Sequence, residues 1–285
     1  MIPASFAYTA PTSLSEALSA LAAGGDEAKI MAGGQSLLPI LRMRLNAPST
    51  VIDLSKIEEL RGISEDGDHV VVGAMTTHSD VVTSELLQQH ATLLVQAVKE
   101  VADPQIRHRG TLGGALAHAD PAGDVGAPAL ALDCEFMIAS QDGSRRTVGA
   151  ADFFVDLFET AVGEDELLVQ IRIPKHTGWG AHYEKFVRVK HQWSIVAVGA
   201  TVRVEGETIA EAKIGLTNMG STPLRATAVE QALIGKPATD EAVREACAAA
   251  ADGTNPPSDL NGDSDYRKHL ATVLTRRAVL AAAAG

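Results

Sequence analysis

Cysteine is scarce in this sequence of 285 residues, and its two copies, Cys134 and Cys247, stand far apart. A structural zinc site or an iron–sulfur cluster takes about four side-chain ligands, so this chain cannot build either from its cysteines alone. A disulfide framework is not indicated, and a reducing cytoplasm is the expected compartment. Cys134 follows an apolar run and is predicted to be buried and unreactive.

Positive charge and long apolar runs are also in short supply. The net charge is −12, which argues against nucleic acid as a partner, because neutralising phosphates requires clustered Lys and Arg. No apolar run reaches the roughly 18 residues that span a bilayer. Residues 1–11 lack the basic and apolar segments of a signal peptide. We expect a soluble protein of about two domains that does not span a membrane.

The common phosphate-binding and catalytic motifs are missing as well. The sequence has neither the GxGxxG fingerprint of a Rossmann fold nor the GxxxxGK[ST] pattern of a P-loop. HExxH, GxSxG and EF-hand patterns are also absent. A conventional dinucleotide-binding or nucleotide-hydrolysing fold is therefore excluded.

Hydrophobic periodicity predicts an α+β organisation. A helix is expected over residues 13–24, and a short strand is expected over residues 29–31. Further helices are predicted over residues 79–89, 91–101, 225–234, 240–251 and 265–284, and antiparallel strands over residues 183–189, 195–204 and 207–216. Residues 104–124 show little periodicity and are predicted to form a long functional loop. Residues 174–180 mark a boundary before a smaller unit of strands followed by helices.

Two glycine pairs stand out, in Ala32-Gly33-Gly34-Gln35-Ser36 and in Thr111-Leu112-Gly113-Gly114-Ala115. Each precedes an apolar run, so each is placed at a turn between two elements. Paired glycines can enter backbone regions closed to other residues and can expose successive N–H groups to an anion. We therefore hypothesise that the two loops hold one diphosphate from both sides. A simple turn is the commoner reason for a single Gly-Gly pair.

Polar and aromatic residues around the second pair allow more than one interpretation. His118, Asp120 and Asp124 have the spacing of a metal-ligand set. A turn at Asp120 and a helix cap at Asp124 are the favoured alternatives. Residues 107–109, Arg-His-Arg, could support an anionic ligand or a docking partner, or could pair with surface carboxylates. Trp193 could cover a planar ring, although a tryptophan that opens a strand more often belongs to a core or an interface.

Four longer motifs carry a family resemblance. They are AGGQSLLP at 32–39, GAMTTH at 73–78, PQIRHRGTLGGALAHADPAGD at 104–124 and VRVKHQWSIVAV at 187–198. Over essentially its whole length the chain resembles the FAD-binding medium subunit of the molybdenum hydroxylases, the xanthine dehydrogenase family, nearest to aerobic carbon monoxide dehydrogenase. The resemblance implies a vanillyl-alcohol-oxidase-type FAD-binding domain of two α/β subdomains over residues 1–176, divided near residue 56. It also implies a C-terminal domain of a small antiparallel sheet with helices over residues 177–285.

The resemblance further implies which residues hold a non-covalent FAD. The two glycine segments are expected at the pyrophosphate, and Asp124 at the ribityl or ribose hydroxyls. Leu168 is expected to pack against the cofactor, with Lys185 and Trp193 at the isoalloxazine side. The full implied set is Ala32, Gly33, Gly34, Gln35, Ser36, Leu37, Thr76, Gly110, Thr111, Gly113, Gly114, Ala115, Ala117, Gly123, Asp124, Leu168, Lys185 and Trp193. No catalytic acid or base and no metal ligand is expected in this chain.

Three positions depart from the family pattern. Gln35 stands where His is frequent, Ala115 stands where Asn is usual, and His191-Gln192 stands where Gly-Asp is usual. The last two bear on a polar contact and on the shape of the loop beside the flavin, and therefore on redox tuning and the electron acceptor.

The implied function is that of an electron-transfer subunit of an oxidoreductase. Electrons from the 2Fe-2S clusters of a small subunit would reach FAD in this chain and pass to quinone or another acceptor. A large molybdenum subunit would oxidise the substrate, with carbon monoxide favoured over an aldehyde or an N-heterocycle. A dimer of heterotrimers is expected in the cytoplasm, held peripherally at the inner face of the membrane through its partners. The alternatives are a self-contained flavin oxidase and a non-redox module for a nucleotide or phosphorylated metabolite.

Overall fold

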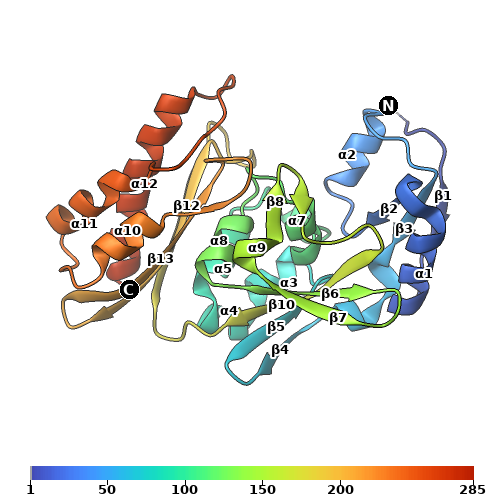
Figure 1. Cartoon of the computed structure of the whole chain (residues 1–285), viewed down its shortest axis with the longest axis horizontal. Coiled ribbons are helices and arrows are strands. Elements are labelled where there is room, and N and C mark those ends of the chain that lie inside the picture. The colour runs from blue at the N-terminus through green and yellow to red at the C-terminus, as the bar shows by residue number, and fades with distance from the viewer. Residues whose placement is uncertain (1) are drawn as a thin grey trace.

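Three main β-sheets follow one another along the chain in the computed structural model (Figure 1). It describes residues 2–285, so Met1, the first residue of the predicted FAD-binding domain, lies outside the described part. The first sheet is parallel, in the order β1 (Ala7–Thr9), β3 (Thr50–Asp53), β2 (Ala28–Met31). Helix α1 (Leu14–Gly24) connects β1 to β2, and Ser13 caps it. The predicted helix over residues 13–24 is confirmed.

Helices and short elements stand between the strands of the first and second sheets along the chain. The helices are α3 (His78–Thr83), α4 (Glu85–His90), α5 (Thr92–Lys99), α7 (Leu112–His118) and α8 (Gly126–Ala131). The short elements are α2 (Leu37–Arg42), α6 (Pro104–Arg107), α9 (Ala150–Phe153), the hairpin of β8 (Phe154–Asp156) and β9 (Glu159–Thr160), and 3-10 turns at Gly25–Glu27, Leu54–Lys56 and Glu58–Leu60.

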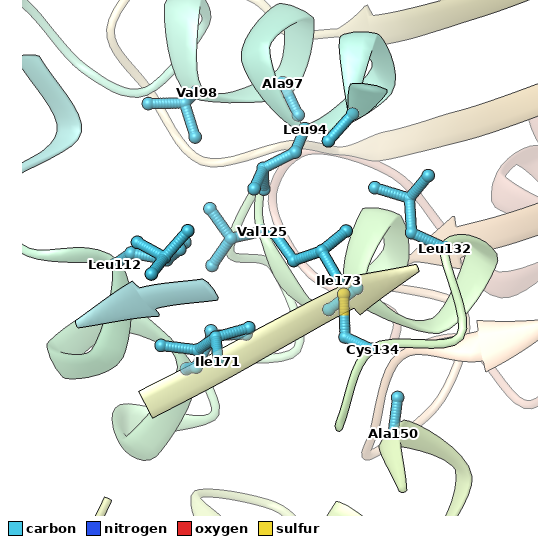
Figure 2. Packing of buried hydrophobic residues seen from close by; sticks show 14 of the residues in the cluster. Leu94, Ala97, Val98, Leu112, Val125, Leu132, Cys134, Ala150, Ile171 and Ile173 are labelled. Atoms are coloured by element: carbon cyan, nitrogen blue, oxygen red, sulfur yellow. The ribbon is translucent and has the colours of Figure 1, made fainter. Parts of the chain in front are cut away.

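The second sheet is antiparallel, and its central strand is buried on both faces. Its strand order is β4 (Ile63–Asp66), β5 (His69–Gly73), β10 (Glu166–Pro174), β6 (Glu135–Ser140), β7 (Arg145–Gly149). Because side chains alternate along a strand, β10 serves two cores. Leu168, Ile171 and Ile173 lie in the main core. Figure 2 shows the two isoleucines with side chains of α5 and α7. Leu167 and Val169 pack with the N-terminal unit instead.

Cys134 lies in the main core at the start of β6, as Figure 2 shows. Both cysteines are buried and unpaired, so the predicted burial of Cys134 is confirmed. Burial raises the pKa of its thiol well above the usual range, which keeps the thiol neutral and unreactive.

The third sheet is antiparallel and lies between two sets of helices. Its strands are, in order, β11 (Gly180–Phe186), β12 (Val196–Glu205), β13 (Thr208–Thr217) and β14 (Leu224–Arg225). One face is covered by α10 (Thr227–Leu233), α11 (Asp240–Ala246), the 3-10 turn Cys247–Ala249 and α12 (Ser264–Ala283), and the other by α5 and α8 (Figure 1). A Cβ on Gly215 would lie 2.1 Å from the Ala127 carbonyl oxygen, so the sheet and α8 are in direct backbone contact.

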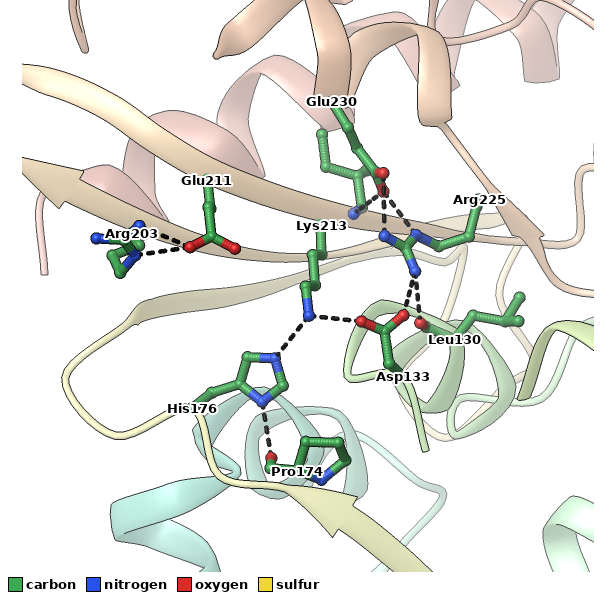
Figure 3. A network of polar contacts seen from close by, with 10 residues as sticks. Leu130, Asp133, Pro174, His176, Arg203, Glu211, Lys213, Arg225 and Glu230 are labelled. Carbon is green, nitrogen blue, oxygen red and sulfur yellow. Dashed lines mark hydrogen bonds and ion pairs between the residues drawn. The ribbon is translucent and has the colours of Figure 1, made fainter. Parts of the chain in front are cut away.

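A polar network ties this sheet to the rest of the chain (Figure 3). Asp133 follows α8 with a φ of 49°. Its carboxylate accepts hydrogen bonds from Lys213 of β13 and, at 2.6 Å, from Arg225 of β14. His176, in the connection between β10 and β11, lies 3.4 Å from the Lys213 Nζ and donates from Nδ1 to the Pro174 carbonyl. The Asp133 carboxylate therefore bridges two cations where these segments meet, and Glu230 also pairs with Arg225.

Two sequence predictions are corrected by short helices. Residues 104–124 are not one loop, because they contain α6 and α7, capped by Asp103 and Thr111. Helices of four and seven residues are too short for a hydrophobic period to emerge, and the glycines of α7 lower its helix propensity. The helix predicted over residues 79–89 is divided at Ser84, whose hydroxyl caps α4.

The strand predicted over residues 183–189 ends at Phe186. Residues 187–194 therefore form a loop, and Trp193 lies in that loop and does not open a strand. Within residues 2–285, no helix combines the length and the apolar character needed to cross a bilayer.

Candidate functional site

The two glycine pairs lie against each other, although one follows β2 and the other begins α7. A Cβ on Gly33 would lie 2.1 Å from the carbonyl oxygen of Arg109 and 2.7 Å from the Gly110 Cα. A Cβ on Gly114 would lie 2.9 Å from the Ala32 Cβ. The fold thus brings together the two segments that the sequence singled out, at a distance that larger side chains would not permit.

The first loop offers a row of backbone donors. Gly34 has a φ of 74°, which glycine adopts readily and other residues rarely do. Among the described residues, the N–H groups of residues 33–36 have no hydrogen-bond partner. The Gln35 side chain donates back to the Gly33 carbonyl at 3.0 Å, which helps to hold the loop in shape. Such a row of free N–H groups suits phosphate oxygens.

The second loop uses its glycines differently. Leu112 and Gly113 donate their N–H groups to carbonyls of residues 74–76, and Gly114 donates to the Thr111 hydroxyl. The expectation that the second glycine segment exposes its own N–H groups is therefore wrong for Leu112, Gly113 and Gly114. A Cβ on Gly113 would lie 2.6 Å from the Ala74 carbonyl oxygen, so the absence of a side chain lets α7 pack directly on the backbone at Ala74. The Thr111 hydroxyl still has a hydrogen to donate.

A pocket of about 80 Å³ lies where the loops meet. Its lining residues come from both glycine segments, from the 75–77 segment and from the residues after β3: Ala32, Gly33, Ser55, Arg61, Met75, Thr77, His108, Arg109 and Thr111. Two guanidinium groups and an imidazole give the pocket a basic character. The anionic-ligand interpretation of residues 107–109 thus gains support for His108 and Arg109. Arg107 instead donates to the Val101 carbonyl at 2.8 Å.

Two residues of the GAMTTH motif hold the pocket wall from behind. Thr76 is buried, and its hydroxyl donates to the Gly62 carbonyl at 3.1 Å. His78 is buried against Gly110 and donates its backbone N–H to the Gly110 carbonyl. Burial, together with the nearby Arg107 charge, lowers the pKa of His78 to about 4. The ring is therefore neutral at physiological pH and adds no charge to the pocket.

Asp124 is the centre of a second, buried polar cluster. Its Oδ2 accepts a hydrogen bond from the Lys185 Nζ at 2.8 Å. Its Oδ1 accepts from the Tyr183 hydroxyl at 2.7 Å and from the Ser194 hydroxyl at 3.2 Å. Burial raises the pKa of the Asp124 carboxyl, and the three donors oppose that change by stabilising the anion. No side chain caps α8, so the capping interpretation of Asp124 is wrong.

The metal-ligand interpretation finds no supporting geometry. Asp120 Oδ1 accepts the Ala122 N–H at 2.9 Å, which is the predicted turn. The His118 ring lies 5.1 Å, between centroids, from the Phe158 ring. No group of three His, Cys, Asp or Glu side chains within residues 2–285 is arranged to hold a metal ion.

The remaining predicted residues are spread around these two centres. Ser36 and Leu37 begin α2, Ala115 and Ala117 lie on α7, and Gly123 donates to the Asp120 carbonyl in the turn before Asp124. Leu168 faces the main core. Trp193 is 64% exposed in the loop between β11 and β12.

Four residues of the two polar centres were not predicted from the sequence. Ser55 and Arg61 line the pocket, and Tyr183 and Ser194 hold Asp124. Arg61 stands in no motif, and Ser194, although inside the 187–198 motif, has no pattern that pairs it with Asp124. Only the tertiary fold brings these side chains to the site.

Comparisons with known proteins agree on one family. Residues 4–176 match the family model described as the FAD binding domain in molybdopterin dehydrogenase, and residues 181–282 match the carbon monoxide dehydrogenase flavoprotein C-terminal domain. The carbon monoxide dehydrogenase medium chain of Hydrogenophaga pseudoflava is 42% identical, with 99% of this chain and 98% of that protein covered. The glyceraldehyde dehydrogenase medium chain of Sulfolobus acidocaldarius is 34% identical, with 98% of each covered.

Solved structures show the same fold. A carbon monoxide dehydrogenase from Hydrogenophaga pseudoflava superposes with a TM-score of 0.96 at 43% identity, covering 100% of this chain and 99% of that one. Quinoline 2-oxidoreductase from Pseudomonas putida 86 gives a TM-score of 0.95 at 35% identity over the same shares.

Proposed function

Because this chain belongs to the family of FAD-binding medium subunits of the molybdenum hydroxylases, we propose that it holds FAD between its two glycine loops and relays electrons through it. The predicted family and fold class are confirmed, and the chain is an oxidoreductase subunit. We also propose an FAD-binding domain over residues 1–176, with subdomains that meet near residue 56, and a C-terminal domain over residues 177–285.

The observation that carries this proposal is the cradle formed by the two loops. The free N–H groups of residues 33–36 would bind the pyrophosphate oxygens, and the Thr111 hydroxyl would donate from the opposite side. Arg61 and Arg109 line the same pocket and would offset the charge of a diphosphate. The first loop can lie this close to Arg109 and Gly110 only because Gly33 has no Cβ. The residues present therefore fit the anionic part of FAD.

The Asp124 cluster would hold the sugar-like part of the cofactor. A carboxylate has about four acceptor sites, and three donors occupy Asp124, so capacity remains for one cofactor hydroxyl. Lys185 favours the charged form of that carboxylate and fixes it in place. FAD supplies the redox chemistry when bound, and this chain supplies its position, electrostatics and access. We assign no catalytic acid or base to this chain.

We further propose that electrons arrive from 2Fe-2S clusters of a small partner subunit and leave to quinone or another acceptor. The two distant cysteines of this chain support clusters carried elsewhere. Substrate oxidation would belong to a large molybdenum subunit, in a cytoplasmic dimer of heterotrimers associated with the inner face of the membrane. Relatives are named for carbon monoxide, nicotine and caffeine, which supports a substrate chosen outside the medium chain. Carbon monoxide is our preferred substrate, since two relatives at 42% and 39% identity carry that name.

The test is to isolate the protein from its own cells under gentle conditions and to examine its colour, metals and companion chains. We expect visible flavin absorption, FAD and not FMN on release, and co-purified chains that carry molybdenum and iron. Flavin bleaching by carbon monoxide would support the proposed substrate, and bleaching only by an aldehyde or N-heterocycle would replace it. A flavoprotein without partner chains would favour a self-contained oxidase. A folded protein without flavin would favour the non-redox module and refute the proposal.

A further inference from the structure

The loop of residues 187–194 leads to the Asp124 cluster and carries two exposed apolar side chains, those of Val189 and Trp193. Its base is closed by a hydrogen bond of 2.9 Å from the Ile195 N–H to the Phe186 carbonyl. Ser194, at one end, is buried and binds Asp124. The neighbouring residue, Trp193, is 64% exposed. An exposed indole therefore stands next in the chain to a side chain that binds Asp124, and it is available to contact a planar ligand.

His191, near the tip of this loop, has an unfavourable backbone conformation and one compensating contact. Its φ of 76° lies in the left-handed region that residues other than glycine rarely adopt. Its Nδ1 donates a hydrogen bond of 2.7 Å to the Ala102 carbonyl. A hydrogen bond of 3.3 Å from the Gln192 N–H to the Val189 carbonyl closes the tip on itself, and the His191 side chain ties it to the Ala102 turn.

The turn that receives this bond belongs to the proposed cofactor site. Ala102 lies between α5 and α6, ahead of the second glycine pair, and itself has a φ of 40°. Lys185 donates to the carbonyl of Glu100 in the same turn at 3.0 Å, besides its bond to Asp124. The turn is thus held from β11 by Lys185 and from the loop tip by His191.

We propose that His191 is a positioning residue, which fastens the 187–194 loop to the Ala102 turn and so fixes the Trp193 indole beside the isoalloxazine ring. This inference rests on the proposed binding of FAD and goes beyond it. His191 touches neither the cofactor nor an acceptor in this scheme. It acts through Trp193, by limiting how far the indole moves from the flavin and how open the flavin is to small molecules.

The experiment measures the fluorescence of the bound flavin in the protein isolated with its partner chains, because a stacked indole quenches it. The substitution His191→Ala removes the bond and leaves the backbone strain, because alanine disfavours the left-handed conformation as histidine does. His191→Asn keeps an amide donor and tolerates the left-handed conformation. Lys190→Ala changes an exposed neighbour and is the matched control. Trp193→Ala defines the fully unquenched level. Flavin content per chain is measured for every variant.

Loss of one hydrogen bond should raise the population of the displaced loop about fivefold. We therefore expect brighter flavin in His191→Ala, with FAD content unchanged, and wild-type quenching in His191→Asn and Lys190→Ala. Unchanged fluorescence in His191→Ala, with Trp193→Ala bright, would overturn the role of His191. Flavin that is no brighter in Trp193→Ala would overturn the placement of the indole. Absence of flavin from the wild-type protein would refute the proposed function itself, and the flavin assay separates that result from the others.

Discussion

The α-carbon of Gly33 lies against the carbonyl oxygen of Arg109, so that a Cβ built on it would come within 2.1 Å of that oxygen. The neighbouring Gly34 makes no such backbone contact, but it has a φ of 74°. The two glycines of one pair therefore meet different demands. Gly33 allows one loop to touch the other, and Gly34 turns the chain so that the N–H groups of residues 33–36 stay free.

The substitution Gly33→Ala should separate the two loops. Its methyl group would meet main-chain atoms of Arg109 and Gly110, which cannot rotate away as a side chain can. Overpacking of this kind costs about 1–3 kcal/mol. We expect a lower free energy of unfolding in urea and, because the cradle widens, loss of most of the bound FAD. Gly149→Ala is the matched control, since its φ is −69° and no atom lies within 4 Å of its added Cβ. Full FAD retention in Gly33→Ala would contradict the cradle.

The substitution Asp124→Asn should destabilise the protein strongly. It leaves the Lys185 ammonium, whose side chain is 5% exposed, without its carboxylate. Breaking one side of a buried ion pair costs about 3–5 kcal/mol. The double variant Asp124→Asn with Lys185→Met should recover part of that loss in urea unfolding. The exposed pair of Asp240 and Arg276 provides the comparison, where Asp240→Asn should cost less than about 1 kcal/mol. Equal effects of the two Asn substitutions would show that the Asp124 pair is not effectively buried.

His78 should make the protein less stable as the pH falls below about 6.5. Its pKa is about 4 in the folded chain and 6.5 as the ordinary value, so the unfolded chain takes up the proton first. The neutral ring's contribution is complete above pH 6.5 and is lost progressively towards pH 4. At about 1.36 kcal/mol per pH unit, the loss reaches about 3 kcal/mol.

The measurement for His78 is urea unfolding at a series of pH values. His78→Gln should flatten the acid limb of the stability curve, whatever it does to stability at neutral pH. His269→Gln alters an exposed histidine on α12 and should leave the slope unchanged. An identical acid slope in the wild type and His78→Gln would exclude His78 as the group responsible.

Local sequence signals predicted the longer elements well. The helix over residues 13–24 has apolar spacing and a serine cap, and both features are local. The short helices α6 and α7 were missed because each lacks room for a period, and two glycines occupy the first turn of α7. The boundary of β11 was missed because residues 187–189 still look like a strand, although the chain there has left the sheet.

The site was only partly predictable, for a different reason. The glycine pairs were recognisable as loops, and the family resemblance brought Asp124 and Lys185 into one set. That Asp124 binds Tyr183 and Ser194 depends on how β11 and the 187–194 loop pack beside the main core. Likewise, Arg61 reaches the pocket only because the first and second sheets meet there. Such contacts between distant segments leave no local pattern in the sequence.

The two halves of the cradle belong to different sheets, and affinity is therefore coupled to how the sheets are docked. A chain in which the N-terminal unit has swung away offers only half a site, so apparent affinity falls with the docked fraction. Substitutions far from the pocket can weaken ligand retention in this way without touching the ligand. In return, a bound dinucleotide adds its binding energy to the docked state by mass action. The cofactor would then serve as a tie between the N-terminal unit and the rest of the chain.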